Sequence, residues 1–325
     1  MNITLGVPRL QEIINAAKAI STPIITAQLD QDDNPVVARV VKAGIEKTTL
    51  GQVTKCFKEV YSSERYYISV ELDLEAVEQL KLNIDALSVR NSILNGTPGV
   101  TRNIIMRSLK AADVLIKKGS NAKLRIHVPQ IKSTIKKKPE PYFAMQMLKT
   151  SLPEVIVQGI ASINRAVINE KEEAGKPSTY DLLMEGYGLQ QVMGCPGING
   201  LKTTTNHVME VEQVLGVEAA RTQIKAEIKY MMDVYGVGID YRHLLLLSDV
   251  MTFKGNVLGF TRHGISKMRE SVLVLASFET TTEHLFDAAV HGRTDGTVGV
   301  SECIIMGKNI PVGTGLPSLF WRPSL

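Results

Sequence analysis

Apolar side chains recur at helical spacing in two long segments of this chain, residues 6–22 and residues 217–235. In the first segment, Pro8 falls in the opening turn, where its missing N–H leaves no hydrogen bond unmade, and Pro23 disfavours helix beyond Thr22. In the second segment, Gly236 follows as a C-cap. Each segment is predicted to be a helix with one apolar stripe, formed by Leu10, Ile13, Ile14, Ala17 and Ile20 in the first and by Ile224, Ile228, Met231, Met232 and Tyr235 in the second.

Alternating or continuous apolar runs predict strands over residues 24–29, 66–72, 124–128, 154–159, 165–168, 180–185 and 257–261. Helical spacing predicts a helix, a turn and a second helix over 36–59, with Thr48 or Thr49 as a cap near the break. Further helices are predicted over 74–87, over 145–152, from Asp240 to 251, and from one of Thr280, Thr281 and Thr282 to 291. Residues 186–200 are rich in glycine and predict turns. Helices and strands do not alternate regularly, so the expected fold class is α+β, in a chain of several domains.

Composition narrows the class of protein only slightly. The 325 residues carry 37 basic and 33 acidic side chains, a net charge of +4, which fits a protein that touches phosphates at a few places. No apolar run is long enough to cross a bilayer, and no secretory signal is visible, so we expect no membrane. Cys56, Cys195 and Cys303 form no CxxC pair, which excludes a zinc ribbon in this chain and suggests a reducing compartment.

Common catalytic motifs are absent from the sequence. There is no GxxxxGK[ST] phosphate loop, no GxSxG elbow and no HExxH helix. Gly186 and Gly188 form a GxG without the third glycine of a dinucleotide site, which indicates a turn. Asp32 and Asp33 are the one adjacent aspartate pair, and their place beside a proline predicts a solvated turn. A metabolic α/β enzyme is therefore a weak alternative.

Five segments carry a resemblance to one family. They read TLGVPRLQEIINAAKAISTPIITAQL at 4–29, IEKTTLGQV at 45–53, VMEVEQVLGVEAARTQIKAEI at 208–228, DYRHLLLLSDVMTFKGNVLGFTRHGI at 240–265 and GVSECIIMGKNIPVGTG at 299–315. In this order they resemble the C-terminal part of the largest subunit of multisubunit RNA polymerases. The segment ISTPIITAQLD is most similar to eukaryotic DNA-directed RNA polymerase III.

The resemblance implies an arrangement of modules. Residues 1–55 would be the segment of the cleft that follows the trigger loop, and residues 56–142 a jaw-like domain that grips downstream DNA. Residues 143–315 would be the cleft and switch region at the base of the clamp, and residues 316–325 depart from the family pattern. Residues 132–141 hold four lysines and two prolines and form the clearest linker, near the implied jaw–cleft border. Lys136, Lys137 and Lys138 could touch DNA there, although a solvated linker is the simpler interpretation.

Residues 261–279 resemble the first switch of the family, in which an arginine meets the backbone of the template strand. That position is Arg262, and a guanidinium forks well onto phosphate oxygens. Lys267 and Arg269 would add positive charge, and Gly264 would let the backbone bend as a hinge. His263 is either a second phosphate donor or a packed histidine. The alternative for the whole segment is a surface turn with solvated charges. Arg242 and His243 open the preceding helix, where a structural role is expected.

The resemblance also indicates what the chain lacks. The family holds its catalytic Mg²⁺ on an NADFDGD-type loop, since two-metal phosphoryl transfer needs clustered carboxylates, and this sequence has no such loop. We therefore expect no catalytic residue and no cofactor in this chain, with Mg²⁺ and Zn²⁺ implied for the complete subunit. The trigger-loop histidine and the bridge helix are missing too, so we expect a fragment or an incomplete gene model, inactive alone.

The function implied by the resemblance is a contribution to DNA-directed RNA synthesis in the nucleus, by a nucleotidyltransferase that transcribes small RNAs. The chain would hold downstream DNA and link the clamp to the template. Its expected partners are the second-largest polymerase subunit, small polymerase subunits, and template and downstream DNA. The alternative is a free-standing DNA-binding or assembly protein built from polymerase modules, which light scattering and thermal melting would reveal as an independently stable fold.

Overall fold

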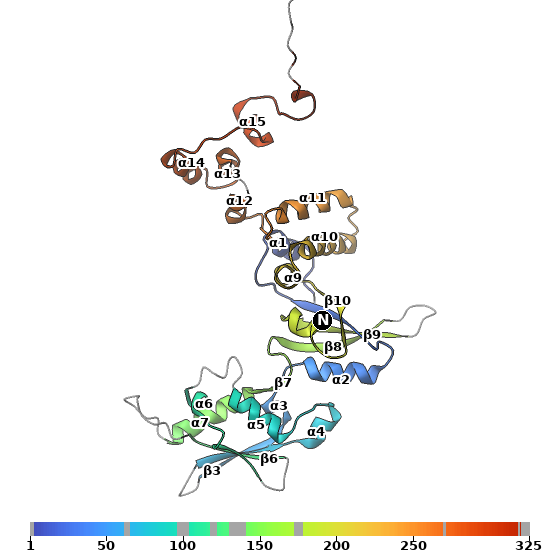
Figure 1. Cartoon of the computed structure of the whole chain (residues 1–325), viewed down its shortest axis with the longest axis vertical. Helices are drawn as coiled ribbons and strands as arrows, with labels where there is room; N and C mark the ends of the chain where they lie inside the picture. The colour runs from blue at the N-terminus through green and yellow to red at the C-terminus, as the bar shows by residue number, and fades with distance from the viewer. Residues whose placement is uncertain are drawn as a thin grey trace, which may run out of the picture. The chain divides into compact units, whose positions relative to one another are not determined.

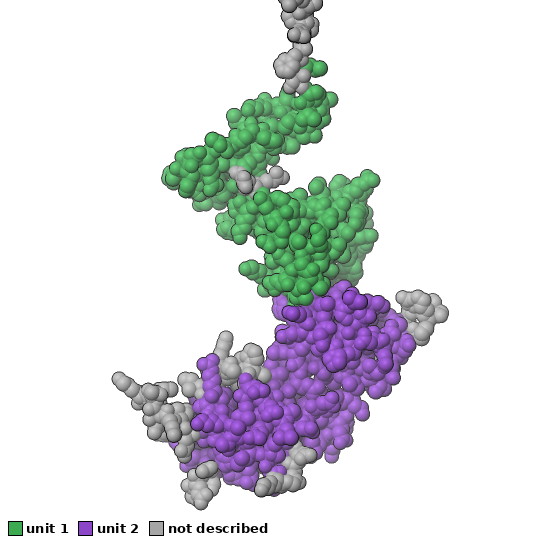
Figure 2. Space-filling view, in the orientation of Figure 1, with its two compact units in different colours: residues 1–21, 207–325 green, residues 22–206 purple. Residues whose placement is uncertain are grey.

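The chain forms two compact units in a computed structural model that describes residues 3–61, 66–95, 104–117, 122–129, 141–171, 178–268, 271–317 and 319. Unit 1 comprises Met1–Ser21 and His207–Leu325, and unit 2 comprises Thr22–Asn206 (Figure 2). Helices and antiparallel sheets are both present, which confirms the α+β class. The predicted boundaries at 55/56 and 142/143 both fall inside unit 2. Of the predicted linker, only Pro141 belongs to the described residues.

The first sheet of unit 2 has the strand order β10-β1-β9-β8, with every neighbouring pair antiparallel (Figure 1). Its strands are β1 (Ile24–Leu29), β8 (Ile163–Lys171), β9 (Thr179–Gly186) and β10 (Ile198–Thr205), with helices α2 (Pro35–Ile45) and α8 (Leu189–Met193) nearby. The predicted strands over 24–29, 165–168 and 180–185 are confirmed, the last two as parts of longer strands. The glycine-rich stretch 186–200 contains α8 as well as turns.

The second sheet of unit 2 has the order β3-β4-β6-β5, and helices cover one of its faces (Figure 1). Its strands are β3 (Thr54–Tyr61), β4 (Tyr66–Leu72), β5 (Val114–Ile116) and β6 (Lys123–His127). The helices of this part are α3 (Leu50–Val53), α4 (Leu74–Gln79), α5 (Ala86–Asn95), α6 (Ile104–Ser108), α7 (Pro141–Ser151) and the 3-10 turn η2 (Leu152–Glu154). The short strands β2 (Thr48–Thr49) and β7 (Ile156–Gln158) pair separately. Ile68, Val70, Leu124 and Ile126 face the helices and are fully buried.

Two predicted elements of unit 2 are wrong. The second helix over 36–59 is instead the single turn α3 followed by strand β3, which pairs with β4 from Thr54↔Leu72 to Tyr61↔Tyr66. Pairing with another strand overrides a local helical spacing, because the sheet supplies both hydrogen bonds and apolar neighbours. The predicted cap is Thr49, whose N–H donates to Gln52 Oε1 at 3.0 Å. The predicted helix over 74–87 is split into α4 and α5, with Lys81 at a left-handed φ of 56° between them.

Unit 1 is helical in the part that the structure describes. It contains α1 (Val7–Ile14), α9 (Val208–Leu215), α10 (Val217–Val234), α11 (Tyr241–Thr252), α12 (Arg262–Met268), α13 (Val272–Phe278), α14 (Thr281–Val290), α15 (Val300–Met306) and the 3-10 turn η3 (Gly313–Gly315). A core of Ile13, Val211, Ile224, Ile228, Leu244 and Met251 joins α1, α9, α10 and α11. Gly236 has a left-handed φ of 69° after α10, and the Asp240 side chain accepts from the N–H of Arg242 at 2.8 Å. Both predicted helix boundaries are thus confirmed.

The predicted strand over 257–261 is wrong, because three different groups bind its backbone. The N–H of Val257 donates to the Glu212 carboxylate at 3.0 Å, and that of Leu258 donates to the Met251 carbonyl at 2.9 Å. The N–H of Phe260 donates to the Ile14 carbonyl at 2.8 Å. Because its backbone N–H groups bind separate elements, this segment forms no ladder of hydrogen bonds with a neighbouring strand. It serves as the connection from α11 to α12.

Candidate nucleic-acid interface

The predicted switch residues lie on and beside α12. Arg262, His263 and Lys267 are exposed, whereas Gly264 and Met268 are buried. The segment forms a short helix here, and the side chain of His263 is exposed on it. Arg269 lies outside the described residues.

Helix geometry gathers the exposed side chains on one face. At about 100° per residue, Arg262, Ser266, His263 and Lys267 fall within an arc of about 140°. Gly264 and Met268 lie on the opposite side and are buried. Within the described residues, neither Arg262 nor Lys267 has a carboxylate partner at ion-pair distance. Both charges are available to an external anion such as phosphate.

The start of α12 is fixed by its own capping residue. The N–H of Gly264 donates to Thr261 Oγ1 at 3.2 Å, and the N–H of Ile265 donates to the Thr261 carbonyl at 2.8 Å. The threonine hydroxyl thus satisfies one of the N–H donors that a helix start otherwise leaves free, and its carbonyl accepts the first bond within the helix. The exposed Arg262 therefore follows directly on a well-defined helix start.

Gly264 is required by a close backbone approach. A Cβ at this position would overlap the carbonyl oxygen of Gly259, and a Cβ on Gly259 would in turn overlap the carbonyl of Asn15. The φ of Gly264 lies outside the left-handed region, so steric space rather than conformational freedom explains the glycine. The structure thereby stacks α12 through Gly259 onto the end of α1. The hinge at Gly264 stays a prediction.

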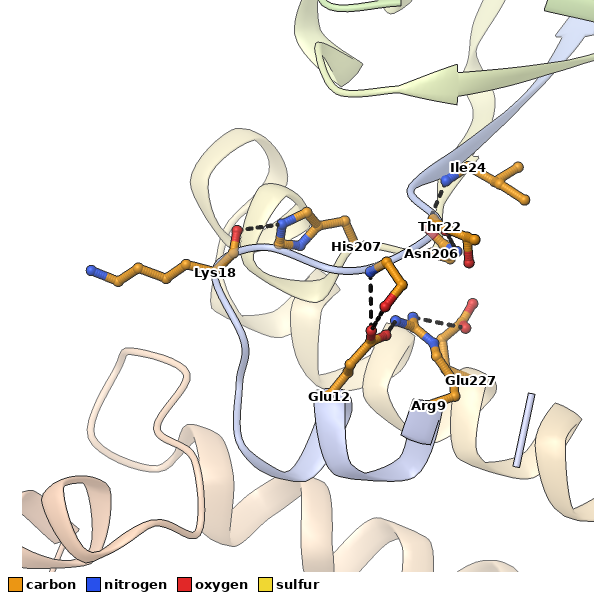
Figure 3. A network of polar contacts seen from close by, with 9 residues as sticks. Arg9, Glu12, Lys18, Thr22, Ile24, Asn206, His207 and Glu227 are labelled. Carbon is orange, nitrogen blue, oxygen red and sulfur yellow. Dashed lines mark hydrogen bonds and ion pairs between the residues drawn. The ribbon is translucent and has the colours of Figure 1, made fainter. Parts of the chain in front are cut away.

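A buried ion-pair network attaches α1 to α10 (Figure 3). Arg9 is 4% exposed, and its guanidinium pairs with Glu12 at 3.0 Å and with Glu227 of α10 at 3.3 Å. The other oxygen of Glu12 accepts from the N–H and the hydroxyl of Ser21, at 3.0 and 2.8 Å. The Lys18 carbonyl lies 3.1 Å from Nε2 of His207. These contacts hold the first 21 residues within unit 1.

The two carboxylates on Arg9 have opposite pKa shifts. Burial raises the pKa of Glu227, and the nearby Arg9 opposes this only in part. Burial also acts to raise the pKa of Glu12, but the hydrogen bonds from Ser21 and Arg9 outweigh it, so that the pKa is lowered. No apolar feature of the predicted helix pointed to this network. The available signal was a basic residue, Arg9, among the apolar positions of a short helix.

The network also explains why α1 ends at Ile14 and not near Thr22. Ala16 has a left-handed φ of 48°, and the carbonyls of Ile14 and Lys18 have partners on other elements. Ala17 and Ile20 therefore do not continue the predicted stripe, and this part of the prediction is wrong. Of the predicted α10 stripe, Ile224, Ile228 and Met231 are buried, whereas Tyr235 is exposed.

The remaining candidate residues contribute no further site. Arg242 and His243 are exposed on the first turn of α11, and Lys136, Lys137 and Lys138 lie outside the described residues. In the described part of the chain, no three His, Cys, Asp or Glu side chains come together in a way that could hold a metal ion. No helix among the described residues is both long and apolar enough to cross a membrane.

Comparison with known proteins identifies relatives along the whole chain. The chain is 51% identical over 316 residues to "DNA-directed RNA polymerase III subunit rpc1" of Dictyostelium discoideum, which covers 97% of this chain and 21% of that protein. It is 49% identical over 322 residues to the subunit RPC1 of Homo sapiens and 46% identical over 324 residues to that of Saccharomyces cerevisiae. These matches cover 99% and 97% of this chain, and 22% and 21% of the two relatives.

The chain thus spans about a fifth of the length of the curated relatives it matches. A family model described as "RNA polymerase Rpb1, domain 5" matches residues 1–273. The resemblance predicted from the sequence is confirmed by both findings. The chain belongs to the RNA polymerase Rpb1 domain 5 family.

Proposed function

We propose that this chain is a C-terminal portion of an RNA polymerase III largest subunit and contributes to DNA-directed RNA synthesis in the nucleus. Its part is to hold downstream DNA and to link the clamp to the template strand. The second-largest subunit and small subunits are its partners in the assembled nucleotidyltransferase. The proposal is supported by the relatives, whose names are those of polymerase III subunits.

The observation that carries the DNA contact is the exposed face of α12. Arg262 and Lys267 have no carboxylate partner among the described residues, and Gly259 and Gly264 stack the helix on α1. A fixed helix with free cations suits contacts to phosphate, which position a duplex without reading its sequence. The catalytic Mg²⁺ and the Zn²⁺ belong, in this proposal, to parts of the subunit outside this chain.

Arg262→Ala tests the phosphate contact in the assembled enzyme. Affinity for template DNA should fall by a similar factor for all sequences, and the slope of log K against log salt should become shallower by about one. Fluorescence anisotropy at several salt concentrations measures both. Arg293→Ala is the matched control, because Arg293 is an exposed arginine of the same unit. A loss of affinity confined to some DNA sequences would contradict the assignment of Arg262 to phosphate.

The absence of the catalytic machinery gives a second test. The purified chain, given a primed template, all nucleotides and Mg²⁺, should extend no RNA, since clustered carboxylates are needed for two-metal phosphoryl transfer. Gel analysis of labelled primer measures this. Template-dependent elongation by the chain alone would contradict the proposal that the catalytic metal site belongs to other parts of the subunit.

A further inference from the structure

The second sheet of unit 2 has one face that the described helices leave open. On the covered face, Ile68, Val70, Leu124 and Ile126 pack with α5 and α7 in one apolar core. On the open face, the strand register aligns three rows of side chains across β3, β4 and β6. These rows are Cys56–Glu71–Lys123, Lys58–Ser69–Arg125 and Val60–Tyr67–His127.

The open face carries excess positive charge. Lys58, Lys123 and Arg125 face a single acid, Glu71, which leaves a net charge of +2 with His127 neutral. Glu71 lies 2.9 Å from the Lys123 ammonium and 3.5 Å from that of Lys58. The hydrogen bond from Lys123 lowers the pKa of Glu71, so this carboxylate stays ionised at neutral pH. The surplus charge thus resides mainly on Arg125 and on Lys58, whose side chain is 64% exposed.

Apolar surface lies directly beside these charges. Leu115 of β5 is 47% exposed and stands opposite Arg125 in the register. The Arg125 guanidinium lies 5.5 Å from the centre of the Tyr67 ring, and the His127 ring lies 5.3 Å from the same ring. A guanidinium held over an aromatic ring presents a flat, partly apolar platform. Tyrosine and arginine are enriched at protein–protein interfaces, and the exposed leucine beside them adds apolar area that a partner can bury.

We propose that this open sheet face, formed by Lys58, Tyr67, Leu115, Lys123 and Arg125, binds an acidic polypeptide segment of a partner protein. Carboxylates of the segment would meet Arg125 and Lys58, and an apolar side chain would cover Leu115. Nucleic acid fits less well, because a phosphate backbone offers no apolar side chain to cover Leu115, which is 47% exposed. The surface belongs to unit 2 and α12 belongs to unit 1, and the proposal does not depend on the proposed DNA contact.

Fluorescence anisotropy with the whole chain tests this assignment. The probe is a labelled amphipathic peptide of about 14 residues, with leucine at every third or fourth position and Glu or Asp elsewhere. Two further probes are the same peptide with serine for each leucine, and a single-stranded DNA of equal length. The leucine peptide should bind saturably and more tightly than either.

Substitutions locate the binding surface. Lys58→Gln with Arg125→Gln should raise the Kd of the leucine peptide about tenfold, whereas Lys58→Arg, which keeps the charge, should not. Leu115→Ser should weaken binding of the leucine peptide and not of the serine peptide. Lys202→Gln with Arg165→Gln is the matched control, because both side chains are exposed on the other sheet of unit 2.

Three results would overturn the proposal. One is the absence of saturable binding of the leucine peptide to the folded chain, as judged by circular dichroism. Another is an equal loss in the test and control double variants, which would indicate attraction to net charge alone. The third is tighter binding of the DNA with the same loss on Lys58→Gln and Arg125→Gln, which would make the face a nucleic-acid surface.

Discussion

The exposed face of α12 and the open face of the sheet β3-β4-β6-β5 use similar residues in different settings. Arg262 and Lys267 on α12 have no carboxylate partner in the described part of the chain, and no large apolar side chain lies among them. On the sheet, Lys58 and Lys123 share Glu71, and Arg125 lies over Tyr67 beside Leu115. The number of basic residues alone therefore does not define a ligand. On α12, the lack of a carboxylate partner and of apolar neighbours favours phosphate as the ligand. On the sheet, the shared Glu71 and the apolar neighbours favour a polypeptide.

The two faces are also supported differently. Behind α12 lie the backbone contacts of Gly259 and Gly264 and, through α1, the buried pair of Arg9 and Glu227. Behind the sheet lies a core of apolar side chains that includes Ile126. Apolar cores tolerate changes of similar volume, whereas a buried charge or a backbone contact has no close substitute. We expect the α12 region to be the more sensitive to conservative substitution.

Among the substitutions that test this difference in sensitivity, Arg9→Met should cause the largest loss of stability. Removal of the guanidinium leaves Glu227, which is only 21% exposed, as an uncompensated buried charge. The free energy of unfolding of unit 1 should fall by about 3 kcal/mol. Hydrogen exchange in urea, followed on peptides of α10 and of β6, reports the two units separately.

The double variant Arg9→Met with Glu227→Gln is the control for that experiment. It removes the guanidinium and the Glu227 charge together, while Glu12 keeps its hydrogen bonds from Ser21, so a large part of the lost stability should return. Equal destabilisation of the single and double variants would contradict the ion-pair explanation and indicate lost packing instead.

Gly264→Ala should have the next largest effect. The added methyl group would overlap the Gly259 carbonyl, so α12 must shift, at about 2 kcal/mol. The same substitution should weaken DNA binding, because it moves Arg262. Gly238→Ala is the matched control, since a Cβ there meets no atom within 4 Å. Equal unfolding curves for the two variants would refute the close-approach account.

Ile126→Val measures how sensitive the core behind the sheet is to a conservative substitution. Ile126 is fully buried, and loss of one methylene group should lower the free energy of unfolding of unit 2 by about 1 kcal/mol. The basic side chains on the opposite face should keep their positions. Exchange of β6 amides in urea measures the change, and a larger loss than in Gly264→Ala would reverse the proposed order of sensitivity.

The pH dependence of the Arg9 network should be the most subtle effect. Burial raises the pKa of Glu227 above its ordinary value of 4.5, so the stability it confers relative to Gln is fully present below that value. That stability should be lost as pH rises through the folded-state pKa. Glu12 has a lowered pKa, so the stability it confers is present above 4.5 and lost as pH falls through the folded-state value. Urea unfolding gives the difference in free energy of unfolding between the wild type and each of Glu227→Gln and Glu12→Gln. Between acid and neutral pH this difference should fall with pH for Glu227 and rise with pH for Glu12. Changes in the same direction for both would contradict the assignment.

The sequence predicted the elements whose partners lie nearby or whose pattern is long. Strands β1, β4, β6, β8 and β9 followed from runs of apolar residues, and α10 followed from a long helical spacing closed by Gly236. Where the local pattern was short, the predicted element was wrong. Residues 54–61 resemble a helix in isolation but pair with β4, and residues 257–261 resemble a strand but bind three separate elements.

The sequence by itself determined the α+β class, the family and the presence of basic residues at 262, 263 and 267. Only the tertiary structure decided where α1 ends, which face of α12 is exposed and why Gly264 is a glycine. It also brought Arg9 to Glu227, residues 218 positions apart in the chain. The physical reason is one of range: side-chain periodicity reports contacts within a few residues, whereas buried charges and backbone close approaches depend on partners that folding brings together.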